Sequence, residues 1–113
     1  MPSMEGPNIR TFPRMELRIP IELRLRGKTL RVEKPLGNLS VGGLFVNCED
    51  LPVNADVHVC IQAAEPVEAD GVVRFVQPDH SGVGIEFVKI TEPDRQRLDR
   101  LIADLTRRGA SVV

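Results

Sequence analysis

Residues 15–25 read Met15-Glu16-Leu17-Arg18-Ile19-Pro20-Ile21-Glu22-Leu23-Arg24-Leu25. In this stretch, apolar residues alternate strictly with residues that are polar or, at one position, proline. Successive side chains of a β-strand point to opposite faces of a sheet, so this period of two predicts one half-buried strand over residues 15–25. Pro20 belongs to the outward-facing set and has no amide hydrogen to donate. It therefore indicates an edge position or a bulge.

Downstream of this stretch, short apolar segments are separated by turns of hairpin length. We expect five further strands, at 29–36, 44–48, 56–63, 67–76 and 82–88. Gly71 in the middle of one of them suggests a bulge or a bend. No helical crossover separates these segments, which argues against a parallel α/β sheet. The pattern predicts a mainly β fold, a small six-stranded antiparallel β-barrel.

The hydrophobic period changes after residue 90, which predicts a C-terminal helix. Thr91 can cap its first turn, with Pro93 and Asp94 inside that turn, and Gly109 can end it. The apolar residues then recur at helical spacing: Leu98, Leu101, Ile102 and Leu105. We expect this amphipathic helix to pack on the sheet.

Composition limits the classes of function. With 113 residues, the chain has room for one domain and one core, and its net charge is −1. Residues 10–34 carry eight Lys or Arg against three Glu, while residues 49–70 carry six acids and no Lys or Arg. A basic N-terminal part suits an anionic partner, although arginines on a solvated strand face would give the same count. Four Phe and no Trp or Tyr make nucleic-acid modules that stack bases on aromatic rings a poor fit.

Residues 1–9 contain two Pro and one Gly and are predicted to form a tail. No signal-peptide pattern and no apolar run of membrane-spanning length is present in the sequence, so we expect a cytoplasmic protein without membrane insertion. Its two cysteines, Cys48 and Cys60, are then expected to be reduced.

Two groups of polar residues could bind a phosphate-bearing ligand. Arg10 and Arg14 form Arg-x-x-x-Arg, and guanidinium groups bind phosphate bidentately and stack on planar rings. The stretch 38–43 reads as a polar turn: Asn38 can pair with a base edge, Ser40 offers a hydroxyl, and its two glycines allow close approach. Each group alone has a structural explanation, because Asn, Ser and Gly are common in turns.

Taken together, Arg10-x-x-x-Arg14 and Asn38-x-Ser40-x-x-Gly43 resemble the PilZ family of bacterial cyclic di-GMP receptors. The resemblance extends from residue 10 to about residue 105 and includes Ile19-Pro20-Ile21, the segment after Gly43, the last strand and the helix. Residue 9, where many members carry another basic residue, is Ile. The resemblance implies a six-stranded barrel with a C-terminal helix and a single domain over residues 10–109, with 110–113 as a C-terminal tail.

The resemblance also implies cyclic di-GMP as the ligand, with no cofactor or metal. Its contacts would come from Arg10, Arg14, Asn38, Ser40, Gly42 and Gly43. The protein would then be a receptor and adapter rather than an enzyme. It would signal to an unidentified effector protein through ordering of its N-terminal arginine segment. Arg14 and Arg18 also fit Arg-x-x-x-Arg, so either pair could be the working one; the Arg10 register keeps Pro20 in step with the family pattern.

Other functions remain as alternatives. A PilZ-like module that binds protein but no nucleotide is the nearest. A barrel that binds a nucleic acid polymer is disfavoured by the acidic half of the chain. His58 and Cys60 share a strand face, but two donors are too few for a closed zinc site, which needs four. Ser40 has no His and carboxylate at a recognised nucleophile spacing, so we expect no hydrolase.

Overall fold

Eight strands and one helix follow one another in residues 14–109, the part of the chain that this computed structural model describes. They are β1 (Met15–Leu17), β2 (Ile21–Leu25), β3 (Lys28–Val32), β4 (Gly37–Ser40), β5 (Gly43–Val46), β6 (Asp56–Ile61), β7 (Val67–Val76), β8 (Val83–Lys89) and α1 (Glu92–Arg107). The predicted tails, 1–9 and 110–113, lie outside the described residues, and so does Arg10.

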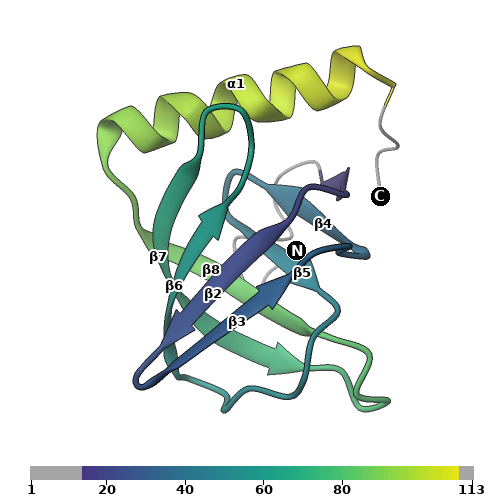
Figure 1. The fold of residues 1–113 in the computed structure, drawn as a ribbon, viewed down its shortest axis with the longest axis vertical. Coiled ribbons are helices and arrows are strands. Elements are labelled where there is room, and N and C mark those ends of the chain that lie inside the picture. The colour runs from purple at the N-terminus through teal and green to yellow at the C-terminus, as the bar shows by residue number, and fades with distance from the viewer. Residues whose placement is uncertain (1–13, 110–113) are drawn as a thin grey trace, which may run out of the picture.

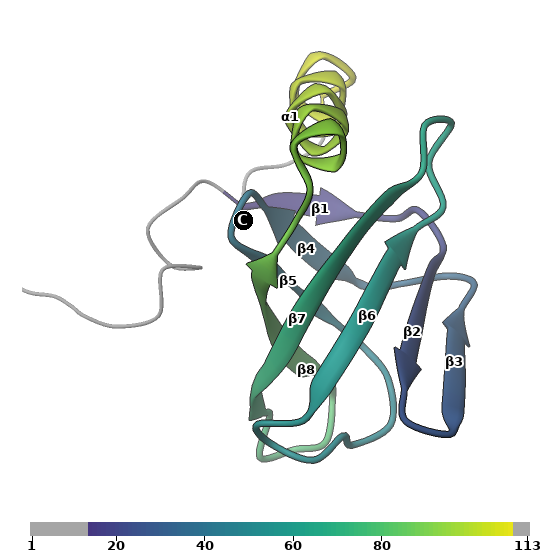
Figure 2. The same cartoon turned by 90° about the vertical axis from the view of Figure 1, so that its left-hand side faces the viewer.

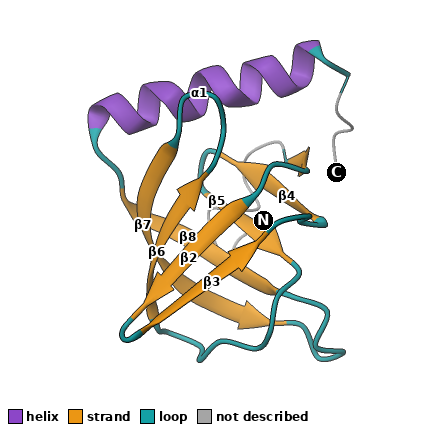
Figure 3. Ribbon diagram, in the orientation of Figure 1, coloured by secondary structure: helices purple, strands orange, loops and turns teal. Residues whose placement is uncertain are grey.

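The strands form one antiparallel sheet in the order β1-β4-β5-β8-β7-β6-β2-β3. This sheet curls into an open barrel, with α1 lying across one end (Figures 1 and 3). β1 and β2 lie near opposite ends of the strand order, yet only residues 18–20 separate them in the chain. The chain itself therefore links the two sides of the curled sheet. The predicted fold class, a mainly β barrel with a C-terminal helix, is confirmed.

The number of strands differs from the predicted six for two reasons. The alternating stretch 15–25 is two strands, because β1 pairs with β4 whereas β2 pairs with β3 and β6. Residues 18–20 form the break, and the carbonyl of Pro20 accepts a hydrogen bond of 2.9 Å from the amide of Gln62. The second reason is β4, which occupies part of the stretch predicted to be a polar turn.

The core follows the alternation seen in the sequence. Fully buried side chains come from the inward-facing positions of the strands and from one face of α1: Leu17, Ile21, Leu23, Leu39, Leu44, Val46, Val59, Ile61, Val67, Val73, Ile85 and Leu98. The predicted irregularity at Gly71 is confirmed, since the pairing of β7 with β8 shifts register between Asp70 and Gly71. The core is aliphatic, which leaves the chain's few aromatic rings for other roles.

The helix α1 begins at the predicted cap and buries the predicted apolar face. The Thr91 hydroxyl accepts a hydrogen bond from the amide of Asp94, and Pro93 lies in the first turn. Leu98, Leu101 and Leu105 are buried against the barrel. Burying three such side chains stabilises the fold by about 5–9 kcal/mol before the loss of conformational entropy. Viewed along its axis, α1 lies above β1 and the start of β7 (Figure 2).

Candidate functional site

The stretch 38–43 is a tight β-hairpin. Asn38 and Ser40 lie within β4 and Gly43 begins β5, so only two residues, Val41 and Gly42, form the loop. The prediction of a polar turn over all six residues was wrong, because pairing of β4 with β1 and β5 keeps the backbone extended up to Ser40. The tip of the hairpin is fixed by a 2.9 Å hydrogen bond from the amide of Phe87 to the carbonyl of Gly42.

Arg14 and Asn38 meet on the outer face of the barrel. Met15, the next residue, points into the core, and Glu16 is the register partner of Asn38 across β1 and β4. The Nε of Arg14 donates a hydrogen bond to Oδ1 of Asn38. The two sequence motifs, separated by more than twenty residues, therefore come together at this point through one strand pair.

The Ser40 hydroxyl is engaged within the hairpin. It is fully buried. Its Oγ accepts a hydrogen bond of 3.1 Å from the amide of Gly42 and lies 3.5 Å from the carbonyl oxygen of Gly43, to which it donates. These contacts stabilise the two-residue loop, as a serine in a turn is expected to do. A direct contact between Ser40 and a ligand remains a prediction.

Arg18, the alternative partner of Arg14, is held by the barrel itself. Its guanidinium donates to the carbonyls of Leu17 at 2.9 Å and Gly37 at 3.4 Å. It also forms an ion pair of 3.1 Å with Glu16. Arg18 thus supports the break between β1 and β2. The other candidate partner, Arg10, lies outside the described residues, so the choice between the two pairs remains a prediction.

An aromatic pair that the sequence did not reveal lies next to this site. Phe45 is the register partner of Asn38 across β4 and β5, which places their side chains side by side. Its ring stacks on Phe75 of β7, with ring centroids 6.0 Å apart and planes inclined by 16°. Gly84 makes room for the pair, because a Cβ at this position would lie 2.0 Å from the Phe75 ring. Both phenylalanines are half-buried on the outer face.

A charged pair borders the other side of the hairpin. Glu86 of β8 is the register partner of Gly43, and its carboxylate accepts a 2.6 Å hydrogen bond from Nε of Arg74. The outer face of β1, β4, β5, β7 and β8 therefore carries cationic, amide, aromatic and carboxylate groups around one hairpin. No sequence motif predicted Glu86 or the phenylalanines as neighbours of Asn38, because these contacts depend on strand order.

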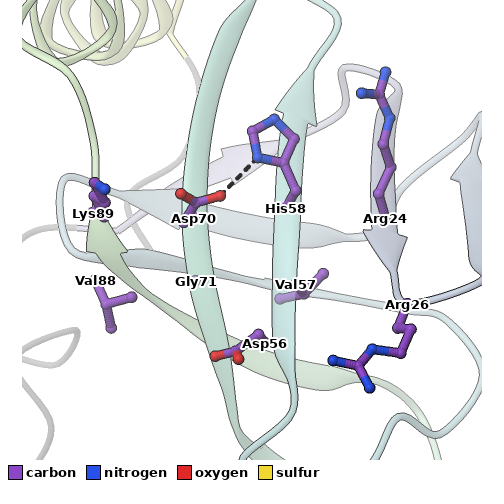
Figure 4. Close-up of a pocket in the computed structure, with 9 residues that line it drawn as sticks. All are labelled: Arg24, Arg26, Asp56, Val57, His58, Asp70, Gly71, Val88 and Lys89. Carbon is purple, nitrogen blue, oxygen red and sulfur yellow. Dashed lines mark hydrogen bonds and ion pairs between the residues drawn. The ribbon is translucent and has the colours of Figure 1, made fainter.

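A separate hollow of about 430 Å³ lies on the outer face of β2, β6, β7 and β8, away from the hairpin (Figure 4). His58 lies beside it, with Nδ1 2.8 Å from Asp70 and Nε2 2.7 Å from Glu68. Because carboxylates only accept, both contacts are hydrogen bonds when each ring nitrogen carries a proton. The hydrogen bond to Asp70, followed by that to Glu68, raises the pKa of His58 above 6.5. Of the motif residues that the structure describes, none lines this hollow.

The two cysteines, Cys48 and Cys60, both carry thiols whose pKa is raised. Burial, followed by the charges of Glu49 and Asp50, raises the pKa of Cys48 to about 11, so its thiol is protonated at neutral pH. Burial likewise raises the pKa of Cys60. Within residues 14–109, no group of three His, Cys, Asp or Glu side chains is placed to hold a metal ion.

The PilZ domain family matches residues 8–104 of the sequence. Among solved structures, the chain is similar to the inhibitor of motility MotI/DgrA of Bacillus subtilis, at 20% identity and a TM-score of 0.68, over 88% of this chain and 52% of that one. It is also similar to YcgR of Escherichia coli in complex with c-di-GMP, at 18% identity and a TM-score of 0.66, over 86% and 46% of the two chains.

These structural similarities show the fold. The chain spans about half the length of both solved proteins. Among curated proteins, no relative matches the sequence. Within residues 14–109, no helix has both the length and the apolar character that crossing a membrane requires.

Proposed function

Because this chain belongs to the PilZ domain family, we propose that it is a cyclic di-GMP receptor and that it acts as an adapter for a partner protein. Cyclic di-GMP is two guanosines joined by two phosphates, so it presents two negative charges and two planar bases. A protein that binds it needs cationic donors for phosphate and polar or flat surfaces for guanine. The outer face around the β4–β5 hairpin offers such groups.

The contact between Arg14 and Asn38 is the observation that carries the proposal. Arg14 supplies a guanidinium that can bind phosphate or stack on a guanine ring. Asn38 supplies an amide that can both accept and donate along a base edge. In the proposed complex, Gly42 and Gly43 leave space for the ligand at the tip of the hairpin. Ser40 keeps that tip in shape through its hydrogen bonds.

Phe45 and Phe75 add an apolar floor to the proposed site. They lie beside Asn38, and their stacked rings are half-buried rather than hidden in the core. A planar guanine over this pair would bury aromatic surface that is otherwise partly in water. The scarcity of aromatic residues in the sequence is thus compatible with one stacking surface for one ligand.

We propose that signalling depends on the N-terminal arginine segment. Arg10 and Arg14 would fold over the ligand, and this ordering of the arginine segment would create a new surface for the partner. The same ligand contacts then determine both affinity and output. Replacing Arg10 should reduce both together.

Isothermal titration calorimetry with cyclic di-GMP tests this function. We expect saturable binding to the full chain at micromolar concentrations, with GMP as a control that lacks the second nucleotide and the cyclic phosphodiester linkages. The Asn38→Ala variant should bind about 10-fold more weakly, which corresponds to about 1.4 kcal/mol. If a folded wild-type sample gives no binding heat at tens of micromolar cyclic di-GMP, the proposal is wrong. The chain would then be better described as an interaction module that binds protein but no nucleotide.

A further inference from the structure

A groove of about 390 Å³ lies between α1 and the loop that joins β6 and β7. It is separate from the β4–β5 hairpin, since Arg14 and the ligand residues proposed in the stretch 38–43 do not line it. The charged residues along it are mostly arginines: Arg97, Arg100, Arg107 and Arg108 against Glu65 and Asp104. The side chains that line the groove thus carry a surplus of two positive charges.

Ion pairs reduce this surplus to one positive charge, because Arg97 pairs at 3.3 Å with Asp94, which does not line the groove. Asp104 is shared by two guanidinium groups, with contacts of 3.0 Å to Arg107 and 3.1 Å to Arg108. Arg100 pairs with Glu65 at 3.1 Å, and both side chains are more than half exposed. Cations in the last turn of a helix stabilise its C-terminus, which accounts for Arg107. That explanation does not extend to Arg100, which lies in the middle of α1.

The arrangement of the arginines favours a linear occupant. From Arg97 to Arg108 the helix rises by about 16 Å, at 1.5 Å per residue. A small anion would reach only one end of this row. An extended peptide covers the same length with about five residues, at about 3.3 Å each.

The floor of the groove favours a peptide over a nucleic acid. Ile19, Ala63 and Leu101 give it an apolar strip that can receive an apolar side chain. The carboxylates of Glu65 and Asp104 lie among the arginines and would repel a continuous row of phosphates. A peptide can alternate its charges with apolar residues and so match both features.

We propose that this groove, which we term the α1 groove, docks an acidic segment of a partner protein that also carries apolar side chains. The surface gives the proposed adapter a place to hold its partner, and in that respect it rests on the proposed function. Its recognition chemistry is independent of cyclic di-GMP. The two proposals can therefore fail separately.

Fluorescence anisotropy with a labelled octapeptide of alternating Glu and Leu tests the α1 groove, using the full chain without cyclic di-GMP. We expect saturable binding that weakens as NaCl rises from about 50 to 300 mM, because exposed ion pairs are screened. Arg100→Glu should weaken binding about 10-fold or more. Ala64→Glu places a carboxylate at the groove without removing an arginine and should also weaken binding.

Arg95→Glu is the matched control, because it makes the same charge change on the same helix at an exposed position that does not line the groove. It should leave the affinity within about twofold. Thermal denaturation verifies that each variant is folded. Equal loss in Arg95→Glu and Arg100→Glu would overturn the proposal, as would equal binding of a Lys-Leu octapeptide. Tighter, Arg100-dependent binding of a single-stranded DNA dodecamer would reassign the groove to nucleic acid.

Discussion

Replacing Arg14 with glutamine is expected to weaken cyclic di-GMP binding by about 10- to 150-fold. The Arg14 guanidinium already contacts Asn38 on the outer face, so its position for a ligand is set before binding. Losing a charge-assisted hydrogen bond costs about 1.5–3 kcal/mol. At about 1.4 kcal/mol for each factor of ten in affinity, this range gives the stated loss.

Arg18→Gln should have the opposite profile. The Arg18 guanidinium is engaged with the carbonyls of Leu17 and Gly37 and with Glu16, and its side chain is 53% exposed. Removing these contacts should cost about 1 kcal/mol of folding free energy, which lowers the Tm by about 4–8 °C. Cyclic di-GMP affinity should stay within about threefold of wild type, because the guanidinium is not needed for the ligand.

Calorimetric titration of both variants, with thermal denaturation of each, measures the two effects separately. The reasoning is refuted if Arg14→Gln binds cyclic di-GMP as wild type does. Equal losses of affinity in both variants would instead identify Arg14 and Arg18 as the working pair. A fall in Tm for Arg14→Gln as large as for Arg18→Gln would show that Arg14 also supports the fold.

Three further predictions concern stability. Gly37→Ala should destabilise the fold by about 1–3 kcal/mol in urea unfolding, since its Cβ would lie 2.0 Å from the Phe45 carbonyl oxygen; wild-type stability would contradict this close approach. Asp94→Asn should lose about 1–2 kcal/mol at pH 7. Burial acts to raise the pKa of Asp94, but hydrogen bonds, the largest from the Glu68 amide, outweigh burial and lower the pKa below 3.8. The ionised Asp94 therefore stabilises the fold above pH 3.8, and this contribution is lost as pH falls through the lowered pKa. Urea unfolding at several pH values measures the loss. The raised pKa of His58 means that its protonated ring stabilises the fold fully below pH 6.5, and that this contribution is lost as pH rises through the raised pKa. The His58→Ala variant should therefore show a flatter pH dependence of its unfolding free energy above pH 6.5. An unchanged pH dependence would show that the protonated ring contributes nothing to stability.

The strand faces could be predicted from the sequence because burial alone determines them. Leu17, Ile21 and Leu23 are fully buried at the alternating positions where the period of two placed them. The helix was predictable for a similar reason: the cap at Thr91 and the apolar spacing of α1 are local signals. Neither prediction required knowledge of which strands pair.

The break at residues 18–20 was only partly predictable. Pro20 indicated an irregularity, but alternation continues through Ile19 without interruption. The break arises because β1 must pair with β4 while β2 pairs with β6, and these two strands lie on different sides of the curled sheet. Such a constraint exists only once the sheet has curled, so period alone could not reveal it.

The candidate site was also only partly predictable from the sequence. The resemblance to the PilZ family implied that Arg14 and Asn38 bind one ligand, and their side chains are in contact in the structure. Nothing in the sequence placed Phe45 and Phe75 beside them. Thirty residues separate the two phenylalanines, and they meet because β8 lies between β5 and β7 with Gly84 opposite both. The polar composition of 38–43 suggested a loop, but tertiary pairing overrode this local preference and extended β4.

Nuclear magnetic resonance of the full chain, labelled with nitrogen-15 and titrated with cyclic di-GMP, reports both whether the ligand binds and whether it binds at the β4–β5 hairpin. The largest amide shift changes should fall on Arg14, on residues 38–43 and on Phe45, while amides lining the hollow beside His58 stay unchanged. An unchanged spectrum at saturating ligand, or changes confined to the His58 hollow, would contradict the assignment of the ligand to the β4–β5 hairpin.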